Sequence, residues 1–505
     1  MVSAAAGWAA PAFAVAAVVI WVVLCGELLR RRRRGAGSGK GDAAAAARLP
    51  PGSFGWPVVG ETLEFVSCAY SPRPEAFVDK RRKLHGSAVF RSHLFGSATV
   101  VTADAEVSRF VLQSDARAFV PWYPRSLTEL MGKSSILLIN GALQRRVHGL
   151  VGAFFKSSHL KSQLTADMRR RLSPALSSFP DSSLLHVQHL AKSVVFEILV
   201  RCLIGLEAGE EMQQLKQQFQ EFIVGLMSLP IKLPGTRLYR SLQAKKKMAR
   251  LIQRIIREKR ARRAAASLPR DAIDMLIGDG SDELTDELIS DNMIDLMIPA
   301  EDSVPVLITL AVKFLSECPL ALHQLEEENI QLKRRKTDMG ETLQWTDYMS
   351  LSFTQHVITE TLRLGNIIGG IMRKAVRDVE VKGHLIPKGW CVFVYFRSVH
   401  LDDTLYDEPY KFNPWRWKSN NVLIGQEINQ SQQEKDMSNG SFTPFGGGQR
   451  LCPGLDLARL EASIFLHHLV TSFRWVAEED HIVNFPTVRL KRGMPIRVTA
   501  KEDDD

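Results

Sequence analysis

The sequence predicts a mainly helical fold with a minor β-sheet region, and three observations support this. Apolar residues recur every three or four positions in EEMQQLKQQFQEFIVGLM (210–227) and KKKMARLIQRIIREKRARRAA (245–265), which is typical of amphipathic helices. Short strand-like runs, TVVTAD (99–104) and WCVFVY (390–395), lie between such stretches. The 505 residues, 45% of them hydrophobic, are enough for one large domain or two to three smaller ones.

The first 29 residues are expected to form a single transmembrane anchor. Residues 1–26 carry no charge and include the apolar run AFAVAAVVIWVVLCG, and the basic run Arg30–Arg34 follows. The positive-inside rule then leaves the N-terminus in the lumen and the rest of the chain in the cytosol. A cleaved secretory signal is the alternative, but the basic start of such a signal is missing.

Residues 30–49 read as a basic and flexible tether, and residues 50–505 as the folded domain. Gly, Ala and Ser dominate positions 35–47, whereas prolines stiffen the chain from position 50 onwards. Within the folded domain, residues 418–440 are rich in Asn and Gln and predict an exposed polar loop.

Charge and cysteine content exclude several classes of protein. The net charge of +10 is diffuse outside Arg30–Arg34, and no aromatic-interleaved basic motif indicates nucleic-acid binding. The cysteines show neither CxxC pairs nor close spacing, which argues against a disulfide scaffold or a zinc site. A cysteine with a special role must therefore act alone; the six are Cys25, Cys68, Cys202, Cys318, Cys391 and Cys452.

A long helix is expected from the N-cap Thr285 to a stop at Pro319, with a bend in its middle. Pro299 and Pro305 each remove one intrahelical hydrogen bond, at a cost of about 3 kcal/mol or more. Glu301, Asp302 and Ser303 stand between these prolines. Asp302 beside Ser303 suggests a carboxyl and hydroxyl pair that delivers protons, and the alternative is a kink that faces solvent.

Two further segments suggest an ionic cluster. Glu360 and Arg363 lie one turn apart in TETLRLG and can pair on one helix face. Downstream, Arg416 stands between two tryptophans in YKFNPWRWK. A buried carboxylate can hold two guanidinium groups, so Glu360 is predicted to bind both arginines and to pin the second segment.

The segment FTPFGGGQRLCPG (442–454) places Cys452 between glycine-rich turns and an expected helix that begins near Leu455. A thiol in this position is a packing residue, a nucleophile or a metal ligand. Glycines let backbone N–H groups approach the sulfur, and a helix N-terminus favours its negative form. These features suit a thiolate ligand.

In this order, the bent helix, Glu-x-x-Arg, Phe-x-Pro-x-Arg-Trp and Phe-x-x-Gly-x-Arg-x-Cys-x-Gly resemble the signature of the cytochrome P450 superfamily from about Leu49 to the C-terminus. The resemblance implies the P450 fold and haem b (heme b), whose iron Cys452 ligates as a thiolate. It also implies that Phe445 packs on the sulfur side. Arg450 and Arg373 are then expected to contact the haem propionates.

The sequence departs from the family pattern at two places. Where the family usually has Trp-x-x-x-Arg, Gln144 and His148 occur; His148 is then the expected propionate donor, with Arg145 or Arg146 as alternatives. Ser303 replaces the usual threonine and lacks the methyl group that restrains its rotamer.

Four longer segments (119–150, 297–317, 399–417 and 484–496) are similar to the plant group that makes brassinosteroid hormones, in particular to its side-chain (carbon 23) hydroxylases. The implied activity is insertion of one oxygen atom from O2 into a steroid C–H bond. Oxidation at carbon 3 or carbon 6, or of a gibberellin or abscisic acid precursor, is the alternative within enzymes. A haem carrier without turnover is a further alternative, although such a carrier needs no proton relay.

Apolar side chains suited to a rigid sterol are candidates for the substrate pocket, and each is equally compatible with an ordinary core position. They are Trp122, Phe222, Leu226, Met297, Ile368 and Phe485.

The resemblance implies a single-pass protein of the endoplasmic reticulum membrane, in contact with lipid, that receives NADPH-derived electrons from an NADPH-cytochrome P450 reductase. No flavin or nicotinamide motif occurs in the chain. A basic face around the cysteine loop, with Arg450 and Arg459, would suit an acidic flavoprotein.

Overall fold

The computed structural model describes residues 49–501, apart from 58, 181, 227, 263–268, 419–439 and 486. The expected membrane anchor, all but the last residue of the tether and nearly all of the polar loop lie outside the described residues.

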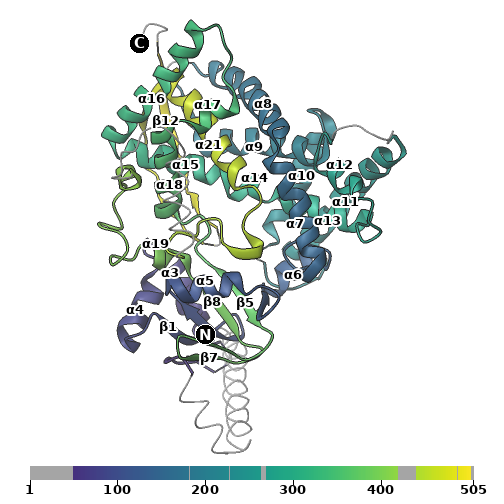
Figure 1. Cartoon of the computed structure of the whole chain (residues 1–505), viewed down its shortest axis with the longest axis vertical. Helices are drawn as coiled ribbons and strands as arrows, with labels where there is room; N and C mark the ends of the chain where they lie inside the picture. The colour runs from purple at the N-terminus through teal and green to yellow at the C-terminus, as the bar shows by residue number, and fades with distance from the viewer. Residues whose placement is uncertain are drawn as a thin grey trace, which may run out of the picture.

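Helices dominate the described chain, as predicted (Figure 1). The α-helices are α3 (Thr62–Ala69), α4 (Ala76–His85), α5 (Ala105–Gln113), α6 (Arg125–Met131), α7 (Gly141–Lys156), α8 (Ser158–Ser177), α9 (Val187–Ile204), α10 (Glu210–Val224), α11 (Arg237–Arg262), α12 (Ala272–Gly278), α13 (Asp286–Met297), α14 (Pro299–Asp302), α15 (Val304–Ser316), α16 (Pro319–Asp338), α17 (Trp345–Met349), α18 (Ser352–Gly365), α19 (Phe396–His400) and α21 (Leu455–Ser472). Two short 3₁₀ helices are η1 (Pro414–Trp417) and η2 (Gly448–Arg450).

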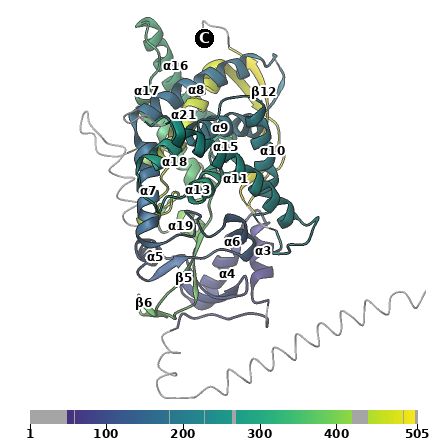
Figure 2. The same ribbon diagram turned by 90° about the vertical axis from the view of Figure 1, so that its right-hand side faces the viewer.

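The largest sheet has five strands in the order β1-β2-β8-β5-β3. It lies at one end of the molecule with α3, α4 and α5, and the long helices fill the rest (Figures 1 and 2). Its strands are β1 (Val89–Leu94), β2 (Ser97–Thr102), β3 (Phe119–Pro121), β5 (Ile371–Ala375) and β8 (Cys391–Val394). Both strand-like runs of the sequence thus form neighbouring strands, β2 and β8, which pair in parallel.

Smaller sheets complete the minor β region. A three-stranded sheet has the order β4-β12-β9, and two hairpin-like pairs are β6-β7 and β10-β11. The bounds are β4 (Leu184–His186), β6 (Val379–Val381), β7 (His384–Ile386), β9 (Phe473–Ala477), β10 (Ile482–Val483), β11 (Arg489–Leu490) and β12 (Pro495–Ala500).

The pairing of β3 with β5 brings two distant segments together. The strands are antiparallel, with Pro121 opposite Arg373. The backbone N–H of Trp122 continues the ladder by donating to Met372 O over 3.2 Å. The segment that follows β3 therefore lies beside Arg373.

The predicted long helix is present and is broken where the prolines predicted a bend. The Thr285 side chain caps α13 by accepting from the N–H of Leu288. Pro299 begins α14, and Ser303 separates α14 from α15 with φ −118° and ψ −67°. Because proline donates no hydrogen bond, three short helices replace one straight one.

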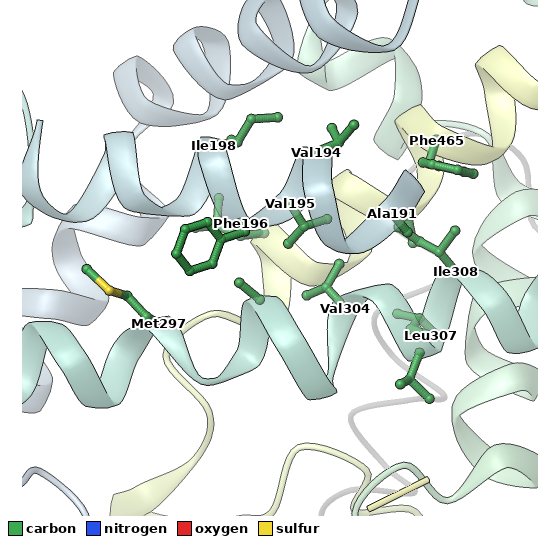
Figure 3. Packing of buried hydrophobic residues seen from close by; sticks show 14 of the residues in the cluster. Ala191, Val194, Val195, Phe196, Ile198, Met297, Val304, Leu307, Ile308 and Phe465 are labelled. Atoms are coloured by element: carbon green, nitrogen blue, oxygen red, sulfur yellow. The ribbon is translucent and has the colours of Figure 1, made fainter. Parts of the chain in front are cut away.

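Apolar contacts hold this broken helix in the middle of the core. Helix α9 lies along it, with Val195 and Phe196 directed towards α14 and α15 (Figure 3). Val304, Leu307 and Ile308 occupy the facing side of α15 and are buried. Full burial of such a side chain is worth about 1.5–3 kcal/mol, so packing fixes the helix despite the break.

Among the helices that the structure describes, none is by itself long and apolar enough to cross a membrane. The stretch Asp286–Ser316 and α16, taken together, meet the requirements for a membrane span by length and composition only. The two parts are bent by 116° relative to each other.

Candidate functional site

The cysteine loop (residues 442–454) contains η2 and ends at the N-terminus of α21, which begins at Leu455 as predicted. The backbone N–H of Cys452 donates to Phe445 O over 3.0 Å, which closes the loop. Gly448 has φ 64°, and a Cβ at this position would approach Leu112 O to 2.3 Å. Only glycine fits there, because α5 packs against the backbone of the loop.

The Cys452 sulfur is free in this structure and sits next to the first turn of α21. Burial raises the pKa of the thiol, and the backbone N–H of Gly454 opposes this rise by donating to the sulfur. Desolvation favours the neutral thiol, so a positive partner such as a metal ion is needed to keep the sulfur ionised.

Arg450 binds protein groups through all three of its nitrogens. Nε donates to Asp115 Oδ2 over 2.9 Å, and the two Nη atoms donate to the carbonyls of Ile136 (3.1 Å) and Ile139 (2.7 Å). Nη2 also reaches Asn140 Oδ1 at 2.9 Å. Arg450 thus ties the cysteine loop to the chain before α7.

Arg459 is not on a basic surface, and the expectation that placed it there is wrong. Its residue exposure is 5%, and its Nη1 donates to Thr359 Oγ1 over 3.0 Å. Burial lowers its pKa to about 10. The guanidinium carbon lies 6.0 Å from the centre of the Phe445 ring, behind the cysteine loop. The sequence did not reveal this because α21 is covered on nearly every side.

Arg373 has a different environment from Arg450. It is buried, and no ion pair to it occurs among the described residues; one Nη1 contact to Met372 O at 3.2 Å is present. Burial lowers its pKa, and the neighbouring Tyr123 hydroxyl and Asp115 oppose this. Burial in turn raises the pKa of Tyr123, against the influence of Arg373 and Arg450. These groups therefore influence one another within one cluster, in which burial disfavours the charged form of Arg373 and the Oδ1 atom of Asp115 is buried without a hydrogen-bond partner among the described residues.

Helix α7 faces the cysteine loop through Gln144 and His148. Gln449 Nε2 donates to Gln144 Oε1 over 2.9 Å, and His148 Nε2 lies 2.7 Å from Leu451 O. Of the two alternatives, Arg145 is exposed. Arg146 forms an ion pair with Asp279 at 2.7 Å.

The helix break brings acidic groups together near α9. Lys192 of α9 forms an ion pair with Glu301. Burial raises the pKa of Asp302, the nearby Glu301 raises it further, and Lys192 and Arg489 lower it. Ser303 follows directly in the break, so the expected carboxyl and hydroxyl lie at a distortion with irregular backbone.

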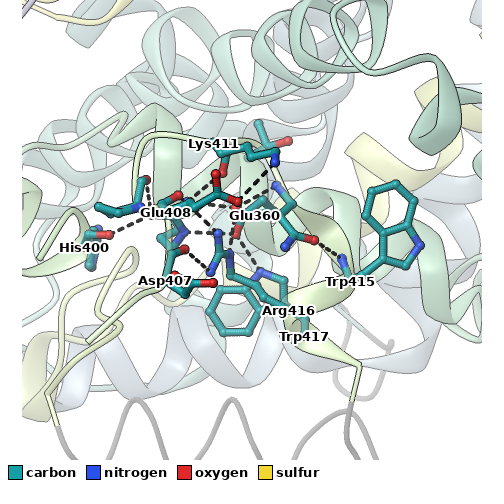
Figure 4. A network of polar contacts seen from close by, with 12 residues as sticks. Glu360, His400, Asp407, Glu408, Lys411, Trp415, Arg416 and Trp417 are labelled. Carbon is teal, nitrogen blue, oxygen red and sulfur yellow. Dashed lines mark hydrogen bonds and ion pairs between the residues drawn. The ribbon is translucent and has the colours of Figure 1, made fainter. Parts of the chain in front are cut away.

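Glu360 binds both expected arginines (Figure 4). Its two oxygens accept from Arg363 Nη2 (2.8 Å) and Nε (2.9 Å), and Oε1 also accepts from Arg416 Nε at 3.0 Å. The Trp417 indole adds a bond of 2.9 Å to Oε2, a partner that the sequence analysis missed. Glu360 and Arg363 have no exposed surface. The carboxylate is saturated by protein donors alone.

His400 is a second residue that the sequence analysis missed. Its Nδ1 lies 2.8 Å from Asn366 Oδ1, and its Nε2 accepts from the Thr443 N–H over 3.0 Å. Its carbonyl accepts from Arg363 Nη1 over 2.8 Å. Burial lowers the pKa of this histidine to about 3, so the ring is neutral. His400 thereby connects the Glu360 cluster to the start of the cysteine loop.

The pattern of residues 50–494 matches the family model described as Cytochrome P450. The chain belongs to this family.

Individual relatives give a more specific comparison than the family model does. The chain is 97% identical to "Cytochrome P450 90D2" of Oryza sativa subsp. indica, over 100% of both chains. It is 58% identical to "3-epi-6-deoxocathasterone 23-monooxygenase CYP90D1" of Arabidopsis thaliana, over 89% of this chain and 89% of that protein. A solved structure, "Retinoic acid bound cyanobacterial CYP120A1", matches with a TM-score of 0.76 at 23% identity, over 90% of this chain and 99% of that one. This last likeness shows the fold.

P450 family membership implies haem held by a cysteine thiolate, and the residues of this chain fit such a group. Cys452 supplies one unpaired sulfur at a helix N-terminus. Arg373 supplies a buried cation that lacks an acidic partner among the described residues. The Gln144 Nε2 atom is likewise buried without a hydrogen-bond partner in that part of the chain. Unpaired buried donors are costly, and two carboxylates of a haem would satisfy them.

The six candidate pocket residues differ in burial. Phe222 and Met297 have no accessible surface and pack within the core, whereas Ile368 is 45% exposed. Leu226 is 9% exposed, and its carbonyl accepts from Ser126 Oγ over 3.4 Å. Trp122 is half-buried beside β5, and Phe485 meets Tyr70 edge-on with ring centres 5.2 Å apart. Of the six, Trp122, Ile368 and Phe485 thus present surface that a substrate could cover.

Proposed function

We propose that this chain is a haem-thiolate monooxygenase that hydroxylates a brassinosteroid-type steroid on its side chain, at carbon 23. The reaction class is supported by one observation above all: a lone cysteine in a glycine-rich loop before α21, in a chain that belongs to the P450 family. The substrate class is supported by the 58% identical relative that is named a 23-monooxygenase.

When haem is bound, it supplies the centre at which O2 is activated and one oxygen atom enters a C–H bond. Cys452 would bind the iron as a thiolate, and the Gly454 N–H would stabilise its negative sulfur by donating to it. Arg373 and Tyr123, with the Gln144 amide, bind the haem carboxylates. Phe445 covers the loop on the sulfur side.

Asp302 and Ser303 are the groups that would deliver protons to the reaction at the haem. The raised pKa of Asp302 lets this carboxyl hold a proton closer to neutral pH than an exposed aspartate can. Ser303 presents a hydroxyl at the break between α14 and α15, where the helix carbonyls are irregular. Lys192 fixes Glu301 beside them. A carrier without turnover has no need of this arrangement.

We further propose that residues 1–29 anchor the protein in the endoplasmic reticulum membrane, in contact with lipid and with the catalytic domain in the cytosol. NADPH-derived electrons then come from a membrane-bound NADPH-cytochrome P450 reductase. The apolar run and the basic residues that follow it support the topology.

The test is to combine the full-length protein with such a reductase, NADPH and a panel of campestanol-derived steroids, and to locate the new oxygen by mass spectrometry. A hydroxyl at carbon 23 is expected, and it should be missing with the Cys452→Ser protein. Oxidation at carbon 3 or carbon 6 would retain the steroid class and change the position. Turnover of a diterpenoid precursor without any steroid product would overturn the substrate assignment.

A further inference from the structure

Helix α7 follows the cysteine loop along a single stripe of its surface. Gln144 contacts Gln449, and His148 contacts Leu451. One and two turns later, the Cα–Cβ direction of Gly152 points at Pro453 at 3.9 Å, and the Phe155 ring lies 3.9 Å from the Cβ position of Gly454. Residues three or four apart share one helix face. The stripe therefore contacts residues before and after Cys452, and these contacts advance along α7 in the same order as along the loop.

The hydrogen bond between His148 and Leu451 can have only one donor and one acceptor assignment. The Leu451 carbonyl can only accept, so the His148 Nε2 atom must carry the hydrogen. At 2.7 Å this bond is short for N–H···O. With its hydrogen committed to Leu451 O, Nε2 is not a donor for a second acceptor. The bonded peptide is the one that immediately precedes Cys452.

Other residues supply what the haem carboxylates require. Arg373 is a buried cation without an acidic partner among the described residues, and Tyr123 lies beside it. Gln144 accepts from Gln449 through Oε1, and its Nε2 group is buried without a hydrogen-bond partner among the described residues. His148 is thus not needed as a propionate donor, although it occupies the place of the arginine in the usual Trp-x-x-x-Arg pattern.

We propose that His148 is a positioning residue for the thiolate: it holds the Leu451 peptide against α7 and so fixes the direction of the Cys452 sulfur towards the iron. This inference rests on the proposed haem-thiolate function. It assigns to His148 an action on the protein backbone, whereas the family pattern would assign it an action on the cofactor.

The two roles can be separated because different side chains replace each of them. His148→Gln places an amide N–H near the original Nε2 position and should keep the bond to Leu451 O. His148→Arg restores the family's propionate donor and carries its N–H groups on a longer side chain, past the original Nε2 position. His148→Leu removes both. His159→Leu, a substitution of an exposed histidine on α8, is the matched control.

The readout is the Soret band of the reduced, carbon monoxide-bound protein, followed over time at a fixed temperature, together with the haem content. The red-shifted band that marks thiolate ligation should decay roughly fivefold faster in His148→Leu, which is the ratio expected for one hydrogen bond, while haem stays bound. His148→Arg should decay like His148→Leu. His148→Gln and His159→Leu should stay within about twofold of the parent.

If His148→Arg kept the slow decay of the parent and His148→Gln did not, the proposal would be overturned in favour of a propionate contact. Loss of haem from the variants, in place of loss of the red shift, would overturn it in the same way. Equal decay in all proteins would show that His148 has no role. If the parent itself lacks the red-shifted band, the proposed function fails, which is a different result. If His148→Leu does not fold, the comparison of His148→Gln with His148→Arg still decides between the backbone contact and the propionate contact.

Discussion

Two buried arginines of this protein show opposite kinds of environment. Arg363 lies in a cluster in which Glu360 accepts from Arg363, Arg416 and Trp417, so every charge has a partner within the chain. Arg373 is almost as deeply buried, yet no acidic group pairs with it in the described residues. A satisfied cluster stabilises the fold, whereas an unsatisfied buried charge indicates a ligand that supplies the missing partner.

The largest expected effect comes from breaking the satisfied cluster. Glu360→Gln leaves two guanidinium groups without their carboxylate, and the loss of a buried partner costs about 3–5 kcal/mol. Chemical denaturation should show this decrease in the free energy of unfolding, together with poor haem incorporation. Glu408→Gln is the matched control: it removes only an exposed pair with Lys411, and should change stability by less than about 0.5 kcal/mol. Equal effects of the two substitutions would refute the contrast.

The unsatisfied arginine should behave in the opposite way. Arg373→Met removes a buried charge that has no acidic partner among the described residues, so the haem-free protein should be as stable as the parent or more stable. The haem-bound protein should lose its cofactor about 10- to 100-fold faster, because charge-assisted hydrogen bonds are worth about 1.5–3 kcal/mol. Transfer of haem to an excess of apomyoglobin measures the rate. The exposed neighbour substitution Lys374→Met should leave it unchanged, and a strong destabilisation of the haem-free Arg373→Met chain would contradict this assignment.

Asp295 has an environment intermediate between that of the paired Arg363 and that of Arg373. The Ser135 hydroxyl donates to its Oδ2, while Oδ1 is buried without a partner in the described residues. Burial raises the pKa of Asp295 from 3.8 to about 7. The folded state therefore binds a proton that the unfolded state has lost between about pH 4 and pH 7, so this group makes the protein less stable as the pH rises through that window.

Asp295→Asn should remove this dependence. Relative to the parent, the variant should gain stability between pH 5 and pH 8, as measured by denaturant unfolding at both values. The free energy of unfolding of Asp295→Asn minus that of the parent should increase as the pH rises, because the parent loses the proton bound to Asp295, and should level off above about pH 7. A difference between the two proteins that is the same at both pH values would show that the carboxyl does not titrate in this range.

The smallest expected effect concerns Ser303. Ser303→Thr restores a methyl group that restricts the hydroxyl rotamer, and should lower the NADPH consumed per hydroxylated product by roughly twofold, a change typical of one restrained rotamer. Ser303→Ala, which lacks the hydroxyl, should raise the same ratio. If both variants match the parent, the hydroxyl takes no part in proton delivery.

The sequence predicted the contacts that depend on fixed spacing. Glu360 and Arg363 are one turn apart, so their pairing follows from helix geometry, and the bend at Pro299 follows from the missing N–H. The loop geometry around Cys452 and the start of α21 were predicted in the same way, because glycines and a helix N-terminus are local features.

Contacts that depend on how distant segments pack could not be predicted. Tyr123 reaches Arg373 only because β3 pairs with β5. His148 meets Leu451 because α7 runs along the loop, and the sequence alone assigned it to the cofactor. Arg459 was placed on the surface because its charge is typical of exposed residues, whereas the packing of α21 buries it. The register between elements, which no single segment encodes, decides each of these cases.

The reduced, carbon monoxide-bound spectrum of three proteins tests the central claim most directly: the parent, Cys452→Ser and Cys202→Ser. Cys202 is the control because it is a fully buried core thiol whose pKa is strongly raised by burial. The parent and Cys202→Ser should show the red-shifted Soret band of a thiolate-ligated haem, and Cys452→Ser should lack it. A red-shifted band that survives in Cys452→Ser would contradict the assignment of Cys452 as the ligand.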